Sequence, residues 1–170
     1  MTVIGRGIRL ILLDCFETLV HLVGDRYQAR KGTAHFLEHF SKRQGVPCVV
    51  VSDGTHEAVS VALTQAKLVG DVSAIYHAGN AQESFPDGRV RKRLDRPLAD
   101  FRIAAKDAVF ISDSKLDQVA SLHYHVPFIR IPRSEDQAFS FESLITGPSQ
   151  YRSGEFELDF LKHYGKGPQP

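Results

Sequence analysis

The chain has 170 residues, a formal net charge of +1, 42% hydrophobic residues and 24% charged residues, which are ordinary values for one globular domain. They argue against a disordered chain, and the near-neutral charge gives no electrostatic argument for nucleic acid or a lipid surface as partner. No apolar run approaches the roughly 18 residues that a membrane-spanning helix needs. The stretch from Arg6 to Leu13 lacks the cleavage site of a signal peptide, and two cysteines fit reduced thiols better than a disulfide scaffold. We therefore expect a cytoplasmic protein.

Five short apolar runs predict the strands of a parallel sheet. Continuous apolar runs without alternation are typical of strands that are buried on both faces. In chain order the runs are residues 8–13, 48–51, 74–76, 108–111 and 126–131.

Amphipathic segments predict helices between these strands. Ala34, Leu37 and Phe40 indicate a helix over about residues 30–43, and Thr55 or Asp53 can cap a second helix. A third is marked by Leu116, Val119, Ala120 and Leu122. The alternation of strands and helices predicts right-handed crossovers and an α/β fold, a Rossmann-like doubly wound parallel sheet.

The rest of the chain adds no second domain. Residues 79–93 are rich in turn-forming residues and are consistent with a hairpin. We expect residues 1–146 to form the α/β core and residues 147–170 to be a C-terminal helical segment with a frayed tail. The helical pattern in that segment rests on Phe156, Leu158, Phe160 and Leu161.

Three of the predicted strands end in polar residues, namely Asp14, Ser52 and Asp113. In an open parallel sheet, ligands bind beyond the carboxyl ends of the strands. Asp117 lies one helical turn after Asp113, so its side chain can face the same cleft. A cluster of Asp14, Asp113 and Asp117 offers hard oxygen ligands, which suit Mg²⁺ and a phosphate substrate. The pattern predicts a magnesium-dependent site at this edge of the sheet.

The same strand ends stand in recognisable motifs. Residues 12–20 resemble the first motif of the haloacid-dehalogenase-like superfamily, a strand followed by Asp-x-Asp-x-Thr, and residues 49–52 are similar to its second. Residues 110–117 resemble the fourth motif, usually Gly-Asp-x-x-x-Asp, with Ser112 in place of the glycine. Lys92 falls where the third motif's lysine is expected. Order and spacing match over roughly residues 8–132.

The resemblance implies magnesium-dependent phosphoryl transfer or hydrolysis. In that chemistry Asp14 is the nucleophile that forms an aspartyl-phosphate. Ser52 and Lys92 bind the oxygens of the transferred phosphoryl group. Mg²⁺ is held by Asp14, the backbone carbonyl of Phe16 and Asp113, with Asp117 helping to hold the metal or its waters. Residues 17–21 are also similar to the carboxy-terminal-domain phosphatase branch, which has a minimal cap and acts on phosphoproteins.

One departure bears directly on activity. Phe16 replaces the motif's second aspartate and cannot protonate a leaving group, a contribution typically worth about 10²–10⁴-fold. The first interpretation of the sequence is therefore a slow or atypical hydrolase, in which Glu17 is a substitute acid. The alternative is a catalytically inactive protein that keeps the fold for binding or regulation. A dehalogenase-like hydrolase is disfavoured, because the segment between Asp14 and Ser52 is too short for a large cap domain.

The missing cap also bears on the partner. An open cleft favours a phosphorylated substrate that is macromolecular, or a partner that closes the cleft. We favour the hydrolase reading, because the other polar positions of the motifs are kept.

Several of these residues could also have structural roles without any part in catalysis. Asp14, Ser52, Asp113 and Asp117 could cap turns or helices, and Lys92 could belong to a solvated basic face with its arginine neighbours. Cys15 fits a small buried residue better than a nucleophile. His123 and His125 lack metal-ligand spacing.

Overall fold

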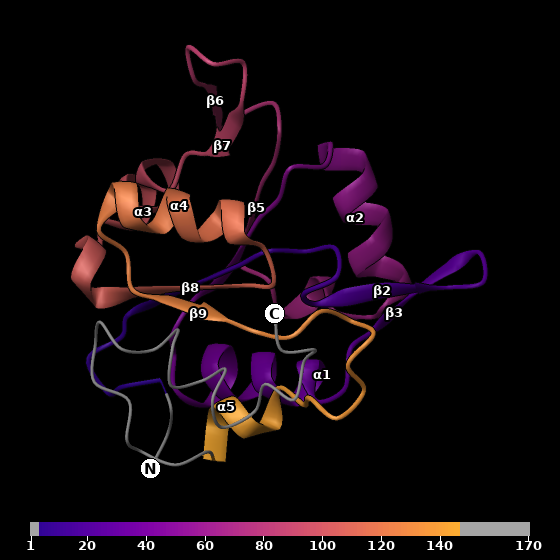
Figure 1. Cartoon of the computed structure of the whole chain (residues 1–170). Helices are drawn as coiled ribbons and strands as arrows, with labels where there is room; N and C mark the ends of the chain where they lie inside the picture. Colours follow the sequence, from indigo (N-terminus) through magenta and orange to yellow (C-terminus); the bar gives the residue numbers. More distant parts are fainter. Residues whose placement is uncertain (1–3, 147–170) are drawn as a thin grey trace.

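A computed structural model describes residues 4–146 and has a parallel five-stranded sheet at its centre (Figure 1). The strand order is β5-β4-β1-β8-β9, and every neighbouring pair is parallel. The strands are β1 (Leu10–Leu13), β4 (Cys48–Val51), β5 (Ala74–Tyr76), β8 (Ala108–Ser112) and β9 (Phe128–Arg130). The five predicted strands and the doubly wound α/β class are confirmed.

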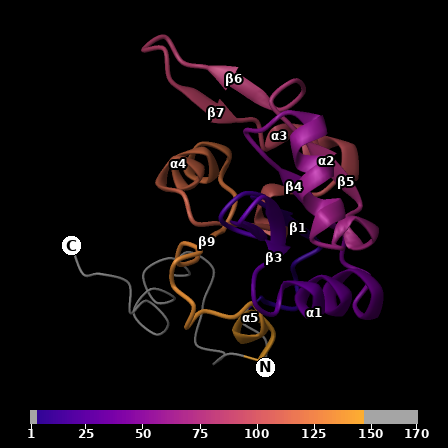
Figure 2. The same ribbon diagram turned by 90° about the vertical axis from the view of Figure 1, so that its right-hand side faces the viewer.

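Helices cover both faces of the sheet (Figure 2). The helices are α1 (Thr33–Leu37), α2 (His56–Gln65), α3 (Asp95–Phe101), α4 (Lys115–Tyr124) and α5 (Glu142–Thr146). A π-helical turn, Glu38–Arg43, continues α1, and 3-10 turns occupy Val69–Asp71 and Ala105–Asp107. The prediction for residues 30–43 is confirmed, and Thr55 caps α2 by accepting a hydrogen bond from the Ala58 N–H at 3.1 Å.

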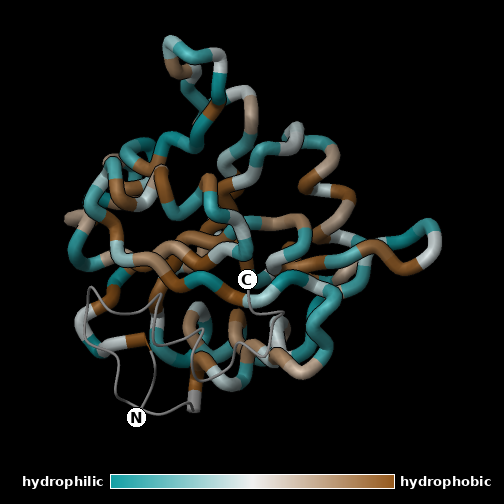
Figure 3. Tube along the Cα trace, viewed as in Figure 1, coloured by the Kyte–Doolittle hydropathy of each residue, from teal (hydrophilic) through white to brown (hydrophobic). Residues whose placement is uncertain are grey.

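Successive residues of each strand enter different cores, because side chains alternate across a sheet. In β1, Ile11 and Leu13 pack with α1, α2 and α5, whereas Leu10 and Leu12 pack with α3 and α4. The four residues of β1 have no exposed surface. Figure 3 shows hydrophobic positions concentrated in the central strands. Burial on both faces explains why these strands read as continuous apolar runs.

Two antiparallel hairpins rise from the sheet. β2 (Val20–Val23) pairs with β3 (Arg26–Ala29), and β6 (Gln82–Ser84) pairs with β7 (Val90–Lys92). The second hairpin confirms the prediction for residues 79–93. Within residues 4–146 the segments after Asp14 and after β5 carry these hairpins and no separate helical domain.

Helix α4 turns most of the apolar residues that mark it in the sequence away from the core, where an amphipathic helix would be expected to bury them. Its apolar residues Leu116, Val119 and Leu122 face solvent, whereas Asp117 is buried. The predicted helical pattern in residues 147–170 lies outside the described residues. In the part of the chain that the structure describes, no helix combines the length and hydrophobicity that a membrane crossing requires.

Candidate active site

The predicted polar residues lie at the carboxyl ends of adjacent strands, at one edge of the sheet. Asp14 follows β1, Asp113 follows β8 on one side of it, and Ser52 follows β4 on the other. Asp14 and Ser52 are buried, and the Ser52 hydroxyl accepts a hydrogen bond from the Gly54 N–H at 3.1 Å. The sheet order therefore places the first, second and fourth motifs side by side.

Lys92 completes the site from a distant part of the chain. Its ammonium group donates to Asp14 Oδ1 at 2.8 Å and to Asp117 Oδ2 at 2.7 Å, and lies 3.7 Å from Asp53. The side chain of Lys92 is 1% exposed. Its neighbours Arg91 and Arg93 pair elsewhere, with Glu83 and Asp95. Among these basic residues, Lys92 is the one that the hairpin directs to Asp14.

Two hydroxyl groups, for which the sequence predicted no role, form hydrogen bonds with the carboxylates. The Thr18 hydroxyl lies 3.2 Å from Asp14 Oδ2 and 3.0 Å from Asp113 Oδ1, and the Asp113 N–H donates to it. The Ser112 hydroxyl donates to Asp117 Oδ2 at 2.6 Å and lies 3.3 Å from Asp14 Oδ2. Thr18 ends the first motif, a signal that could have identified it, whereas Ser112 stands where the motif usually has glycine.

Burial and the repulsion between neighbouring carboxylates raise the pKa of Asp113 and of Asp117. Burial raises the pKa of Asp113, and the charge of nearby Asp14 adds to that rise. Burial also raises the pKa of Asp117 to about 7, although the Lys92 ammonium opposes this rise. Burial by itself lowers the pKa of Lys92, but the charges of Asp14, Asp117 and Asp53 outweigh it and raise the pKa above its ordinary value. Lys92 therefore stays protonated, and the potential beside Asp14 and Asp113 favours a further cation.

The donor set fits Mg²⁺ through two carboxylates. Within residues 4–146, no three His, Cys, Asp or Glu side chains are arranged to hold a metal ion. Lys92 and Ser112 donate to both Asp117 and Asp14. Asp14 and Asp113 in addition converge on the same Thr18 hydroxyl, which places these two carboxylates next to each other. Mg²⁺ is commonly bound by one or two protein carboxylates and keeps several waters, so a neighbouring pair such as Asp14 and Asp113 fits this preference. The roles of Asp14, Asp113, the Phe16 carbonyl and Asp117 as metal ligands remain predictions.

The Phe16 side chain lies against the loop that follows β4. A side-chain carbon on Gly54 would stand 2.8 Å from the Phe16 ring, so only glycine fits there without a shift. The Phe16 and Tyr27 rings are 5.4 Å apart. The neighbouring Glu17 has a positive φ of 61°, and its carboxylate accepts a hydrogen bond from the Ser134 hydroxyl. The motif's acidic position is therefore filled by a packed aromatic ring.

Cys15 is buried within the first motif, and its thiol does not suit nucleophilic chemistry. Burial, and then the charge of Asp14, raise the pKa of Cys15 to about 12. A protonated thiol is a poor nucleophile.

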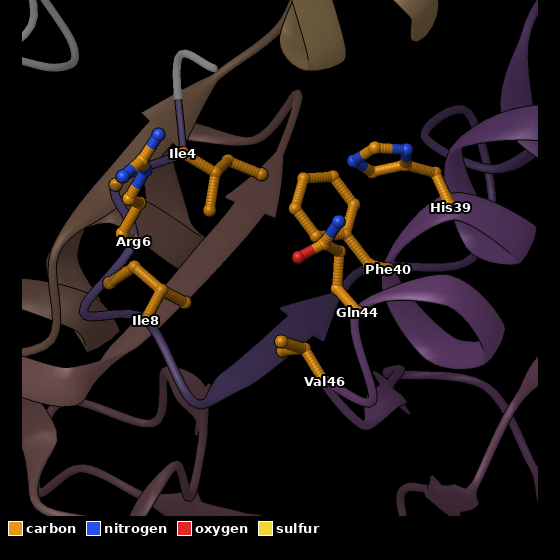
Figure 4. Close-up of a pocket in the computed structure, with 8 residues that line it drawn as sticks. Ile4, Arg6, Ile8, His39, Phe40, Gln44 and Val46 are labelled. Carbon is orange, nitrogen blue, oxygen red and sulfur yellow. The ribbon is translucent and has the colours of Figure 1, made fainter. Parts of the chain in front are cut away.

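Two cavities lie at different places relative to the candidate site. A cavity of about 460 Å³ opens onto the site, lined by Asp53, Gln82, Arg89, Val90, Arg91, Lys92, Leu116 and Asp117. Another, of about 500 Å³, is lined by residues that precede β1 and β4, including Ile8 and Val46, and by the helical segment after α1 (Figure 4). Because ligands bind beyond the carboxyl ends of parallel strands, the smaller cavity is the candidate substrate entrance.

Comparison with known proteins identifies the fold. No family model and no curated protein matches the sequence. The chain is similar in structure to a predicted phosphoglycolate phosphatase from Haemophilus somnus, with a TM-score of 0.63, 13% identity, and 82% of this chain and 92% of that chain covered. It is also similar to a haloacid dehalogenase-like hydrolase from Streptococcus pneumoniae, with a TM-score of 0.62, 13% identity, and coverage of 94% and 100%.

A third similar structure is CbbY from Rhodobacter sphaeroides in complex with phosphate, with a TM-score of 0.62, 15% identity, and coverage of 79% and 90%. The chain therefore has the haloacid-dehalogenase-like fold, as the motifs predicted. At these identities the likeness concerns the fold, and the chemistry depends on the side chains of this chain.

The buried ion pairs generate a stability prediction. Lys92→Met should lower the free energy of unfolding by about 3 kcal/mol or more at pH 8, because it leaves buried carboxylates without their cation. Lys115→Met, which removes an exposed lysine from α4, is the matched control and should change little. Urea denaturation followed by circular dichroism measures both. Equal stability of the two variants would contradict the buried pairing.

Proposed function

We propose that the protein is a magnesium-dependent hydrolase of phosphate monoesters that acts through an aspartyl-phosphate at Asp14. The observation that supports this most is the Lys92 ammonium group 2.8 Å from Asp14 Oδ1, at the carboxyl end of the central strand. A cation there neutralises charge on a nucleophile and on the phosphoryl group that it attacks. Phosphoryl transfer depends mainly on such positioning and electrostatic stabilisation.

The proposed reaction has two steps. An Asp14 carboxylate oxygen attacks phosphorus, forms an O–P bond, and the bond between phosphorus and the leaving oxygen breaks. Water then hydrolyses the aspartyl-phosphate, which releases inorganic phosphate and restores the carboxylate. Lys92 and Ser52 bind the phosphoryl oxygens during both steps, and Asp117 and Ser112 hold Lys92 and Asp14 in place.

Mg²⁺ belongs beside Asp14 and Asp113, where it would supply charge neutralisation for the phosphoryl oxygens. Thr18 keeps the two carboxylates together through its hydroxyl. Phosphate bound to CbbY, a protein of the same fold, supports a phosphorylated ligand for this chain.

Phe16 determines which substrates react well. A phenyl ring cannot donate a proton to the leaving oxygen, so esters with good leaving groups should react faster than alkyl esters. Glu17 is the nearest acidic residue in sequence, and its carboxylate is bonded to Ser134. The alternative function, a phosphate-binding or regulatory protein without turnover, is favoured by the same substitution.

The first test is hydrolysis of para-nitrophenyl phosphate with Mg²⁺ and with EDTA. We expect phosphate release that needs Mg²⁺ and falls by about 10³-fold or more in Asp14→Asn, because the amide is a poor nucleophile. Asp25→Asn, in the exposed turn between β2 and β3, should retain full activity. Equal rates for Asp14→Asn and wild type would contradict the assignment of Asp14.

The second test is Phe16→Asp, assayed on para-nitrophenyl phosphate and on an alkyl phosphate. Restoring an acid should accelerate the alkyl ester by up to about 10²-fold and the aryl ester much less, because the aryl leaving group needs little protonation. The ratio of the two rates is the informative quantity, since misfolding would lower both.

Thermal denaturation checks that Phe16→Asp is folded, because a half-buried carboxylate beside Tyr27 can cost stability. If wild type and a folded Phe16→Asp release no phosphate from either ester, the hydrolase proposal is wrong. The binding function then becomes the better account.

A further inference from the structure

Helix α4 exposes aliphatic side chains along two turns. Leu116, Val119 and Leu122 are 58%, 50% and 68% exposed. Asp117 reaches inward to Lys92, so the residues one turn later on that face are buried, and they are the small residues Ala120 and Ser121. The position of Asp117 thus forces the aliphatic side chains outward. We call Leu116, Val119 and Leu122, together with Val90 of β7, the α4 stripe.

The α4 stripe is continuous with the candidate active site. Leu116 and Val90 line the cavity of about 460 Å³ that also reaches Lys92 and Asp117. Val119 and Leu122 continue the apolar surface beyond that cavity, along the helix. A ligand whose phosphate reaches Lys92 would therefore have its neighbouring groups over the stripe.

Side-chain contacts hold the β6–β7 hairpin against α4, next to the α4 stripe. Arg91 of β7 donates to His123 Nε2 of α4 at 2.8 Å, and its guanidinium lies 4.0 Å from the centre of the Phe85 ring. The Tyr124 hydroxyl donates to Glu83 of β6 at 2.9 Å. These contacts fix the β6–β7 hairpin against α4 (Figures 1 and 2). The surface is therefore preorganised for binding, which lowers the entropic cost of association.

The size and chemistry of the stripe indicate the ligand. Leu116 and Leu122 are six positions apart, which is roughly 9 Å of helix at a rise of 1.5 Å per residue. A small polar phosphate ester gains nothing from aliphatic contacts beyond the cavity, whereas side chains of a polypeptide flanking a phosphorylated residue would cover them. Arg89 lines the same cavity and is exposed, and its guanidinium, 3.6 Å from the exposed Asp87 carboxylate, offers donors that suit a phosphorylated segment. Lys115, one turn before Val119 on α4, is exposed as well.

We propose that the α4 stripe binds a phosphorylated protein segment in which aliphatic residues flank the phosphorylated residue. The proposal rests on the proposed function for the phosphate position, and it names the substrate class. The phosphate lies toward Lys92 and Asp14, while the flanking aliphatic side chains pack on Val119 and Leu122.

The test compares two synthetic phosphoserine peptides, one with leucine and valine flanking the phosphoserine and one with serine and glycine in their place. The protein is the full chain, with Val119→Ser/Leu122→Ser as the variant. Val61→Ser, which changes a valine exposed to 46% on α2, is the matched control. Catalysis is measured as kcat/KM relative to that for para-nitrophenyl phosphate, and binding as fluorescence anisotropy of the labelled peptides with Asp14→Asn protein.

Wild type should prefer the aliphatic peptide by about tenfold or more, the scale expected for burying aliphatic side chains. The variant should lose this preference in both catalysis and binding, and Val61→Ser should keep it. Equal handling of the two peptides by wild type overturns the proposal, even if both are hydrolysed and the proposed function stands. If the preference appears in binding but no phosphate is released, the hydrolase proposal fails while the assignment of the surface is supported.

Other occupants of the stripe give different results. Concentration-dependent dimerisation that Val119→Ser/Leu122→Ser abolishes, measured by sedimentation, would assign the stripe to a second copy of the chain and overturn the proposal. Tighter peptide binding after Phe156→Ser/Phe160→Ser in the full chain would assign it to the chain's own C-terminal residues, with the same consequence.

Discussion

The burial of one ammonium group between two carboxylates determines much of this structure. Lys92 comes from the β6–β7 hairpin, Asp14 from the end of β1 and Asp117 from α4. The Lys92 ammonium donates to Asp14 Oδ1 at 2.8 Å and to Asp117 Oδ2 at 2.7 Å. A buried charge is tolerated when it is paired and hydrogen-bonded, so each of the three elements is held to the others. The pairing also fixes the rotation of α4. The same constraint that builds the candidate active site therefore exposes the apolar side of that helix.

Most of the sheet and part of the site could be predicted from the sequence, because they depend on local patterns. Strands that are buried on both faces leave continuous apolar runs, and Asp14 and Asp113 stand directly at their ends. The β2–β3 hairpin was not predicted, because β2 is a short apolar segment that lies mostly exposed and β3 has no apolar run of its own. The outward face of α4 was also not predictable from periodicity. It depends on Asp117 meeting Lys92, a contact between residues that lie on different elements.

The candidate site combines a cluster of paired charges with an aromatic residue at the position where the first motif has its second aspartate. Asp14, Lys92, Asp113 and Thr18 are joined by hydrogen bonds at the carboxyl end of the sheet, the kind of charge arrangement that the proposed phosphoryl transfer would use. Phe16 stands where the motif has its second acid, and its ring packs against Gly54 and Tyr27. Structural neighbours at 13–15% identity establish the fold but not the reaction. Because general acid catalysis and electrostatic stabilisation contribute separately to rate, losing the first leaves the second in place. The geometry is therefore compatible with slow turnover of esters that need little protonation.

The most direct test of the central claim is to identify the covalent intermediate. Full-length protein is mixed with Mg²⁺ and para-nitrophenyl phosphate, quenched in acid, digested and examined by mass spectrometry. We expect a phosphoryl group on Asp14 that hydroxylamine removes, as for an acyl phosphate, and no adduct in Asp14→Asn. Phosphate release without an adduct on Asp14, or with the phosphoryl group on the adjacent Cys15, would contradict it.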